Sequence, residues 1–153
     1  MPNTYSQVYI QIVFAVKGRQ HFITELMRED LQRFITGIIQ QKKQKLMALY
    51  CMPDHVHVFV SIQPSVAISD LVRDIKANST LWIKSNFKQM QGFSWQEGFG
   101  VFSYAKSQAQ QVIDYVLKQP EHHKRTTFHQ EYIAFLKAFE VEYKDEYLFE
   151  FYL

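Results

Sequence analysis

The sequence predicts an α+β fold in which an antiparallel sheet carries helices packed on one face. Two patterns predict it: short segments of alternating apolar and polar residues, typical of strands, and longer segments with apolar residues every three or four positions, typical of helices. These segments follow one another as strand, helix, strand, strand, helix, strand, with further helical segments after them. The first six elements match the ferredoxin-like (RRM-like) arrangement.

The first half of the chain supplies three strands and one helix. Residues 5–16 alternate and predict a strand with one strongly apolar face. A helix is expected to begin after Thr24, which can cap it, and to end near Lys43. Residues 45–52 and 55–62 predict two more strands, and the Pro-Asp pair between them predicts a hairpin turn.

The second half is mostly helical. A helix is expected over about 67–88, followed by a glycine-containing loop and a short strand near 100–105. Ser107 can cap a third helix, which Pro120 is expected to end. A last helix is expected near 128–140, and an aromatic, acidic tail follows it.

Length and composition indicate one globular domain spanning residues 1–153, with a core at about 5–120 and a C-terminal helix and acidic tail at about 121–153. Hydrophobic residues make up 47% and charged residues 21%, which is typical of a folded soluble chain. The single cysteine, Cys51, excludes a disulfide framework and a cysteine-based zinc cluster. No apolar run is long enough for a membrane span and the N-terminus lacks a signal-peptide pattern, so we expect a cytoplasmic protein.

Charge is unevenly distributed. Residues 1–125 carry fifteen Lys and Arg against nine Asp and Glu, whereas residues 126–153 carry two against six. A basic body with an acidic tail suits a polyanionic partner that the tail does not touch. Many proteins without such a partner share this distribution, so charge alone does not distinguish a protein that binds a polyanion from one that does not.

Two histidines stand out within residues 52–62. Strand alternation directs His55 and His57 to the face opposite the apolar residues of the same strand. Those apolar residues are Val56, Val58, Val60 and Ile62. Two imidazoles two residues apart on a strand can bind one metal ion. A pair of partly exposed histidines without a ligand is the alternative.

The third predicted helix presents a tyrosine away from its apolar stripe. Tyr115 lies roughly 130° from the centre of the stripe, at about 100° per residue. Gln119 lies one turn further along the same flank. The stripe consists of Ala109, Val112, Ile113, Val116 and Leu117. The hydroxyl is thus placed to meet a ligand, although an ordinary surface tyrosine, one of nine in the chain, explains the pattern too.

The run Pro-Asp-His-Val-His-Val-Phe-Val at 53–60 resembles the His-hydrophobe-His (HUH) motif of the single-tyrosine transposases of small bacterial insertion sequences and their repeat-associated relatives. Those enzymes are chains of about this length. Four further segments resemble the family in the expected order: 13–19, 71–76, 95–103 and 113–119, the last matching the helix of the nucleophile. Each segment alone is a weak signal, but their joint order and spacing are specific.

The resemblance implies a metal-dependent transposase that cleaves single-stranded DNA and transfers strands through a 5′-phosphotyrosine intermediate. By this resemblance Tyr115 is the nucleophile, and His55, His57 and Gln119 hold Mg²⁺ or Mn²⁺. The implied partners are single-stranded DNA, as hairpin ends of an insertion sequence, and a second copy of the chain in a homodimer whose subunits share active sites.

Several other residues are candidates for contacts with DNA. The candidates for phosphate contacts are Lys17, Arg19, Arg73, Lys76 and Lys84, since phosphate contacts carry much of such affinity. Trp95 is a candidate for stacking on an unpaired base. Residues 122–125, two histidines and two basic residues, either touch DNA or form a solvated cap.

Two other functions compete with the transposase. One is a non-catalytic or domesticated single-stranded nucleic-acid binding protein, which usually exposes aromatic residues on its central strands, where this chain has His55 and His57. The other is a HUH replication initiator or relaxase. Relaxases are usually longer chains, and many have a third histidine in the motif.

Overall fold

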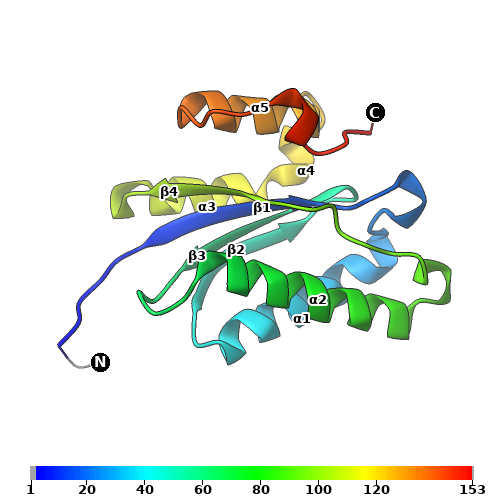
Figure 1. Cartoon of the computed structure of the whole chain (residues 1–153), viewed down its shortest axis with the longest axis horizontal. Coiled ribbons are helices and arrows are strands. Elements are labelled where there is room, and N and C mark those ends of the chain that lie inside the picture. The colour runs from blue at the N-terminus through cyan, green and yellow to red at the C-terminus, as the bar shows by residue number, and fades with distance from the viewer. Residues whose placement is uncertain (1–2, 153) are drawn as a thin grey trace.

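The computed structural model describes residues 3–152 and confirms the predicted ferredoxin-like arrangement (Figure 1). Its elements in chain order are β1 (Tyr9–Ala15), α1 (Glu25–Gln41), β2 (Lys45–Cys51), β3 (His55–Ser61), α2 (Ile68–Asn86), β4 (Gly100–Tyr104), α3 (Ala109–Leu117), α4 (Gln119–His122) and α5 (Phe128–Ala138). The four strands form one antiparallel sheet in the order β2-β3-β1-β4. β3 and β1 are therefore the central strands.

Helices α1 and α2 cover one face of the sheet, the lower face in Figure 1. The alternating residues of β1 and β3 supply the sheet side of this core, and the apolar stripes of the two helices supply the other side. Phe14, Val58, Ile35 and Ile75 are all completely buried. This layer is apolar because each strand and helix in it directs its apolar side chains inward.

The opposite face carries α3 and α5 (Figure 1). α3 packs Val112 and Val116 against Phe59 and Ala48. α5 packs on the other half of the face, and the Thr127 side chain caps its first turn by accepting a hydrogen bond from the Gln130 backbone N–H at 3.1 Å. The apolar contacts of α5 include Phe128, Tyr132 and Leu136 with Val13, Ala15 and Phe102. The C-terminal helix thus completes a second core on the sheet.

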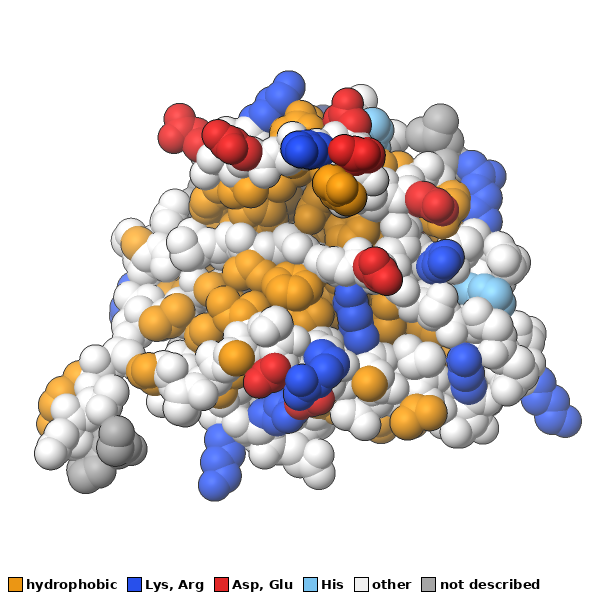
Figure 2. Space-filling model, viewed as in Figure 1, with side chains coloured by type: hydrophobic (Ala, Val, Ile, Leu, Met, Phe, Trp, Pro, Cys, Tyr) orange, Lys and Arg blue, Asp and Glu red, His pale blue; other side chains and the backbone are white. Residues whose placement is uncertain are grey.

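The edge strand β4 lies where these two layers meet. Figure 2 shows hydrophobic side chains gathered between the upper and lower layers along this edge. Gly100 approaches α5 closely here, because a Cβ on it would lie 2.7 Å from the Tyr132 hydroxyl. None of the helices within residues 3–152 is long and apolar enough to cross a membrane.

The segment around the third predicted helix differs from the expectation. A short 3-10 turn, Lys106–Gln108, precedes α3, and Gln108 Oε1 accepts a hydrogen bond from the Ala105 N–H, so Ser107 is not the cap. Pro120 does not end the helix either: α3 stops at Leu117, and Pro120 lies in the first turn of α4. Proline is well tolerated in a first turn, where its missing N–H would have no partner within the helix.

Candidate active site and metal centre

His55 and His57 lie on the face of β3 opposite the apolar core, side by side, as strand alternation predicts. Both are completely buried, because α5 covers this part of the sheet. The His55 ring stacks on Phe128 of α5 with 3.9 Å between centroids. The alternative of two partly exposed histidines is therefore excluded.

Four side chains from three parts of the chain converge at this point. His55 and His57 come from β3, His123 follows α4, and Glu131 comes from α5. One ligand atom from each of them lies within 4.8 Å of the others. Burial of three imidazoles and a carboxylate in one cluster is costly unless each has a partner, so their hydrogen bonds decide what the cluster can do.

Each of the three imidazoles has its Nδ1 at hydrogen-bond distance from an oxygen that accepts. The distances are 2.7 Å from His55 to the Asp54 carboxylate, 2.6 Å from His57 to Gln11 Oε1 and 2.7 Å from His123 to the Thr126 carbonyl oxygen. The proton therefore sits on Nδ1 in each ring, and a neutral ring directs the lone pair of Nε2 inward. This is the hydrogen bonding that orients metal-binding histidines in proteins.

With all three rings neutral, the inward atoms would be acceptors that face acceptors. Glu131 Oε1 lies 3.0 Å from His57 Nε2, 3.2 Å from His123 Nε2 and 3.4 Å from His55 Nε2. The side-chain oxygen of Gln119 lies 3.1 Å from His55 Nε2 and 2.9 Å from His123 Nε2. A divalent cation bound among these atoms would relieve their mutual repulsion, so the residues present fit a metal ion.

Protonation is the other way to relieve the repulsion in the ion-free protein. Burial alone would lower the pKa of His55, but the neighbouring carboxylates Asp54 and Glu131 raise it to about 9. Burial keeps the pKa of His57 below its usual value. Burial would raise the pKa of Glu131, but the surrounding imidazoles hold it well below the usual range, so Glu131 stays ionised. The cluster thus combines an anion with imidazole nitrogens, as a cation site requires.

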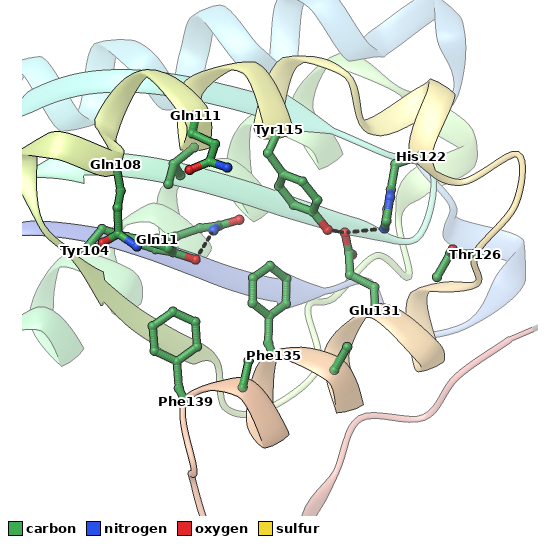
Figure 3. A pocket seen from close by; sticks show the side chains of 13 residues that line it. Gln11, Tyr104, Gln108, Gln111, Tyr115, His122, Thr126, Glu131, Phe135 and Phe139 are labelled. Atoms are coloured by element: carbon green, nitrogen blue, oxygen red, sulfur yellow. Dashed lines mark hydrogen bonds and ion pairs between the residues drawn. The ribbon is translucent and has the colours of Figure 1, made fainter.

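Tyr115 reaches the same cluster from α3. Its hydroxyl donates a hydrogen bond to Glu131 Oε2 (Figure 3). Glu131 Oε1 faces the imidazoles of His55, His57 and His123. The Gln119 side-chain NH₂ donates to the same Oε2 at 2.9 Å. Burial and the Glu131 charge raise the pKa of Tyr115 above its usual value, so the phenol is protonated at neutral pH. One carboxylate thereby connects the tyrosine to the histidines.

The candidate DNA contacts are spread over the molecule. Lys17 and Arg19 are exposed just after β1, near the end of the sheet that carries His55. Arg73 and Lys84 lie on α2, on the opposite side of the sheet from Tyr115, and Arg73 pairs with Asp70 and Asp74. The structure therefore brings none of these four into the Tyr115 and histidine cluster.

One of the predicted contacts, Trp95, needs correction, and another, Lys76, has partners within the chain. Trp95 is buried in the α1/α2 core, packs edge-on against Phe14 and donates from Nε1 to the Ser79 hydroxyl at 3.0 Å. It offers no face to a base. The Lys76 ammonium group donates to the Gln96 and Gly98 carbonyl oxygens at 2.9 and 2.6 Å, and burial lowers its pKa to about 8. Both residues hold the glycine-containing loop in place.

The sequence patterns missed Glu131 and the position of His123. A signal for Glu131 exists: it lies at the spacing of the buried stripe of α5, with Phe128, Tyr132 and Leu136. An acidic residue on a buried stripe needs a partner. His123 does not form a solvated cap, since its Nδ1 makes a hydrogen bond with the Thr126 carbonyl oxygen and its ring faces the cluster.

Two curated proteins resemble this chain in sequence. The ISDra2 transposase TnpA of Deinococcus radiodurans is 23% identical over 118 residues, which are 74% of this chain and 84% of that protein. The transposase for insertion sequence element IS200 of Salmonella typhimurium is 25% identical over 118 residues, which are 74% of this chain and 77% of that protein.

The solved structures that share the fold include the following two. A candidate transposase from Deinococcus radiodurans R1 matches with a TM-score of 0.63 and 23% identity, over 76% of this chain and 94% of that one. A REP-associated tyrosine transposase bound to a REP hairpin matches with a TM-score of 0.58 and 16% identity, over 79% and 72%. The sequence model of the family described as "Transposase IS200 like" matches residues 4–119. Because that match spans well over half of the 153 residues, the chain belongs to the IS200-like transposases, a family of enzymes that cut and rejoin DNA.

Proposed function

We propose that this chain cleaves single-stranded DNA and transfers the cut strand, with Tyr115 as the nucleophile and a divalent metal ion as cofactor. The observation that carries the proposal is the bridge made by Glu131, which accepts the Tyr115 hydroxyl on one oxygen and faces three imidazoles with the other. A phenol is a weak nucleophile at neutral pH and needs its target activated beside it. The Glu131 bridge keeps the Tyr115 hydroxyl next to the imidazoles that would bind the activating metal ion.

His55, His57, His123 and Glu131 would hold the metal ion, with the Gln119 side-chain oxygen as the further ligand that the family resemblance implies. A bound divalent ion would supply positive charge that polarises the scissile phosphate. Three imidazole nitrogens suit Mn²⁺ better than Mg²⁺, which prefers oxygen ligands. We therefore propose that Mn²⁺ supports the reaction at least as well as Mg²⁺.

In the proposed cleavage, Tyr115 Oη forms a bond to phosphorus and the bond from phosphorus to the 3′-oxygen breaks. The DNA is then joined to Tyr115 through a 5′-phosphotyrosine, and the leaving oxygen takes up a proton as a free 3′-hydroxyl. Glu131 Oε2 is the group in contact with the proton that Tyr115 loses. Attack of a 3′-hydroxyl on the phosphotyrosine rejoins a strand and frees Tyr115, so no high-energy cofactor is consumed.

For the substrate we propose single-stranded DNA that forms hairpins at the ends of an insertion sequence. The structural neighbour described as bound to a REP hairpin supports a folded single strand as the ligand class. We place this activity in the cytoplasm. The homodimer remains a prediction, and light scattering can test it. Within residues 3–152, Tyr115 and the histidine cluster come together in a single chain.

Covalent trapping tests the proposal. Labelled single strands from the flanks of the protein's own gene are incubated with Mn²⁺ or Mg²⁺ and separated on denaturing protein gels. We expect a protein–DNA band that requires metal and disappears in Tyr115→Phe and in His57→Ala. The matched control is Tyr147→Phe, an exposed tyrosine at 79% accessibility, which should leave the band unchanged.

The outcomes separate the proposal from its rivals. A band that survives Tyr115→Phe would move the nucleophile to another tyrosine and refute the assignment. Binding of single strands without any adduct, on strands that contain a mapped element end, would favour the domesticated binding protein. Cleavage that requires a plasmid or replication origin sequence would favour a replication initiator or relaxase.

A further inference from the structure

A cavity of about 550 Å³ opens beside the Tyr115 hydroxyl, between α3 and α5 (Figure 3). This volume is within the range of small-molecule sites in proteins. Most of its lining is apolar, and its most prominent side chains are the aromatic rings of Tyr104, Phe135 and Phe139. Tyr115 and Glu131 line it but His55, His57 and His123 do not, so the cavity adjoins the proposed metal centre and shares Glu131 with it.

The aromatic rings of the cavity are held in fixed positions. Phe135 and Phe139 both pack on Phe102 behind them, with centroids 4.9 and 5.0 Å away. Phe135 also stands perpendicular to the Tyr115 ring at 5.9 Å, and Phe139 packs edge-on against Tyr104 at 5.4 Å. Rigid aromatic side chains of this kind form stacking platforms for unpaired bases, and each stacked base contributes substantially to binding.

Polar groups at the cavity have unused hydrogen-bonding capacity. Among the described residues, the Gln111 amide makes no hydrogen bond, and it extends from α3 toward the cavity (Figure 3). The Tyr104 hydroxyl accepts from Gln11 Nε2 at 2.9 Å, which leaves its own proton to donate. His122 Nε2 is buried and makes no hydrogen bond among residues 3–152, although Glu131 Oε2 lies 3.5 Å from it. The free Gln111 amide and the Tyr104 hydroxyl proton are therefore available to a ligand in the cavity.

Charge decides which part of a nucleotide fits. Within the part of the chain that the structure describes, the only acidic side chain in the lining is Glu131, and no lysine or arginine lines the cavity. A phosphate inside this mostly apolar wall would lose its water with no lysine or arginine to compensate the loss. A nucleobase is planar, uncharged and rich in donors and acceptors, so it matches stacking rings edged by an amide and a hydroxyl.

We propose that this cavity binds one unpaired nucleobase of the DNA strand, next to the phosphate that Tyr115 attacks. The inference rests on the proposed function, because it takes single-stranded DNA as the ligand. It adds a base-binding site in which the rings of Phe135, Phe139 and Tyr104 contact the base, by face or by edge, and the Gln111 amide contacts its polar edge. The base so held would fix the position of the neighbouring phosphate at the Tyr115 hydroxyl.

The affinity for single-stranded DNA, measured in EDTA so that no metal-dependent cleavage occurs, tests the inference separately from the proposed reaction. Fluorescence anisotropy measures the affinity for the labelled single strands that form the adduct, with an abasic residue placed in turn at each position around the cleavage point. Ala138→Leu places a larger side chain in the cavity from an exposed position on α5. The matched control is Ala77→Leu, at an exposed position of α2 on the other side of the sheet. Gln111→Ala removes the free amide without removing an internal hydrogen bond.

We expect one abasic position to weaken wild-type binding about tenfold, in the range of a lost stacked base. Ala138→Leu should weaken binding of the intact strand by a similar factor and should make the same abasic position neutral, while Ala77→Leu behaves as wild type. Gln111→Ala should weaken binding by about threefold to tenfold.

Two results overturn the inference. One is an abasic scan without any sensitive position in the wild type, and the other is an abasic penalty of equal size in wild type and in folded Ala138→Leu. Either can occur while the metal-dependent adduct forms, in which case the proposed function stands and the base site falls. If no adduct forms and no strand binds, both fall together.

Discussion

The two faces of the sheet are built from the same strands, yet they differ in chemistry. Along β3, Val56 and Val58 point to the α1/α2 layer, while His55 and His57 point to the α3/α5 layer. All four are completely buried, so burial does not distinguish the faces. The α1/α2 face contains apolar contacts almost throughout, whereas the other face encloses a carboxylate, three imidazoles and a cavity.

This difference indicates a division of roles. Apolar burial stabilises the α1/α2 face directly, because it removes hydrocarbon from water. Burial of the polar cluster opposes stability unless the hydrogen bonds and a bound cation compensate it. The α1/α2 face therefore stabilises the fold, and the α3/α5 face, which is less favourable to stability, holds Tyr115 beside the histidines.

The largest effect is expected from Glu131→Gln. The change keeps the shape of the side chain but removes the charge that faces the imidazoles. We expect the affinity for Mn²⁺ to fall about a hundredfold, because loss of a charged ligand should cost at least as much as loss of an outer partner of a metal site. Isothermal titration calorimetry measures it. Glu121→Gln, an exposed acid on α4, serves as the control, and equal affinities in the two variants would remove Glu131 from the metal centre.

A smaller effect is expected from His123→Ala, since three of the four donors remain. We expect about a tenfold loss of Mn²⁺ affinity, with His122→Ala losing less than about threefold. The two histidines are sequence neighbours, but only His123 belongs to the group of converging ligand atoms. The same titration checks the pair. The opposite ranking would mean that the cluster takes a different shape in solution.

The smallest effect on metal affinity is expected on the α1/α2 face from Ser79→Ala, which leaves the Trp95 N–H without its acceptor. A buried donor left unpaired costs about 1–3 kcal/mol of unfolding free energy. Urea denaturation measures this loss, and Ser85→Ala at an exposed position of α2 is the control. Metal affinity should not change. A change in metal affinity would show that the two faces are coupled through the sheet.

The sequence was sufficient for the fold and for half of the site. Alternation and helical periodicity placed the strands and the two large helices to within a few residues, because each pattern corresponds to a face that must be buried. The same alternation placed His55 and His57 on the non-core face. Tyr115 was identified from its position off the stripe of α3 together with the family resemblance.

The rest depends on contacts between segments distant in sequence. Glu131 is 74 residues from His57, and only the packing of α5 on the sheet brings them together. Both Glu131 and His123 lie beyond residues 4–119, the part that the family model matches, so the resemblance carried no information about them. Trp95 was misplaced for the opposite reason: a tryptophan beside glycines suits an exposed loop, but its ring fills a space between α2 and the sheet.

The division between the two faces is tested most directly by one pair of neighbours on β3, Val58→Ala and His57→Ala, each measured for unfolding free energy and for the rate of the metal-dependent DNA adduct. For Val58→Ala we predict a loss of about 2 kcal/mol in stability and an adduct rate, per folded molecule, within about twofold of the wild type. His57→Ala should form no adduct even under conditions in which it is fully folded. An adduct at the wild-type rate in folded His57→Ala would contradict the account.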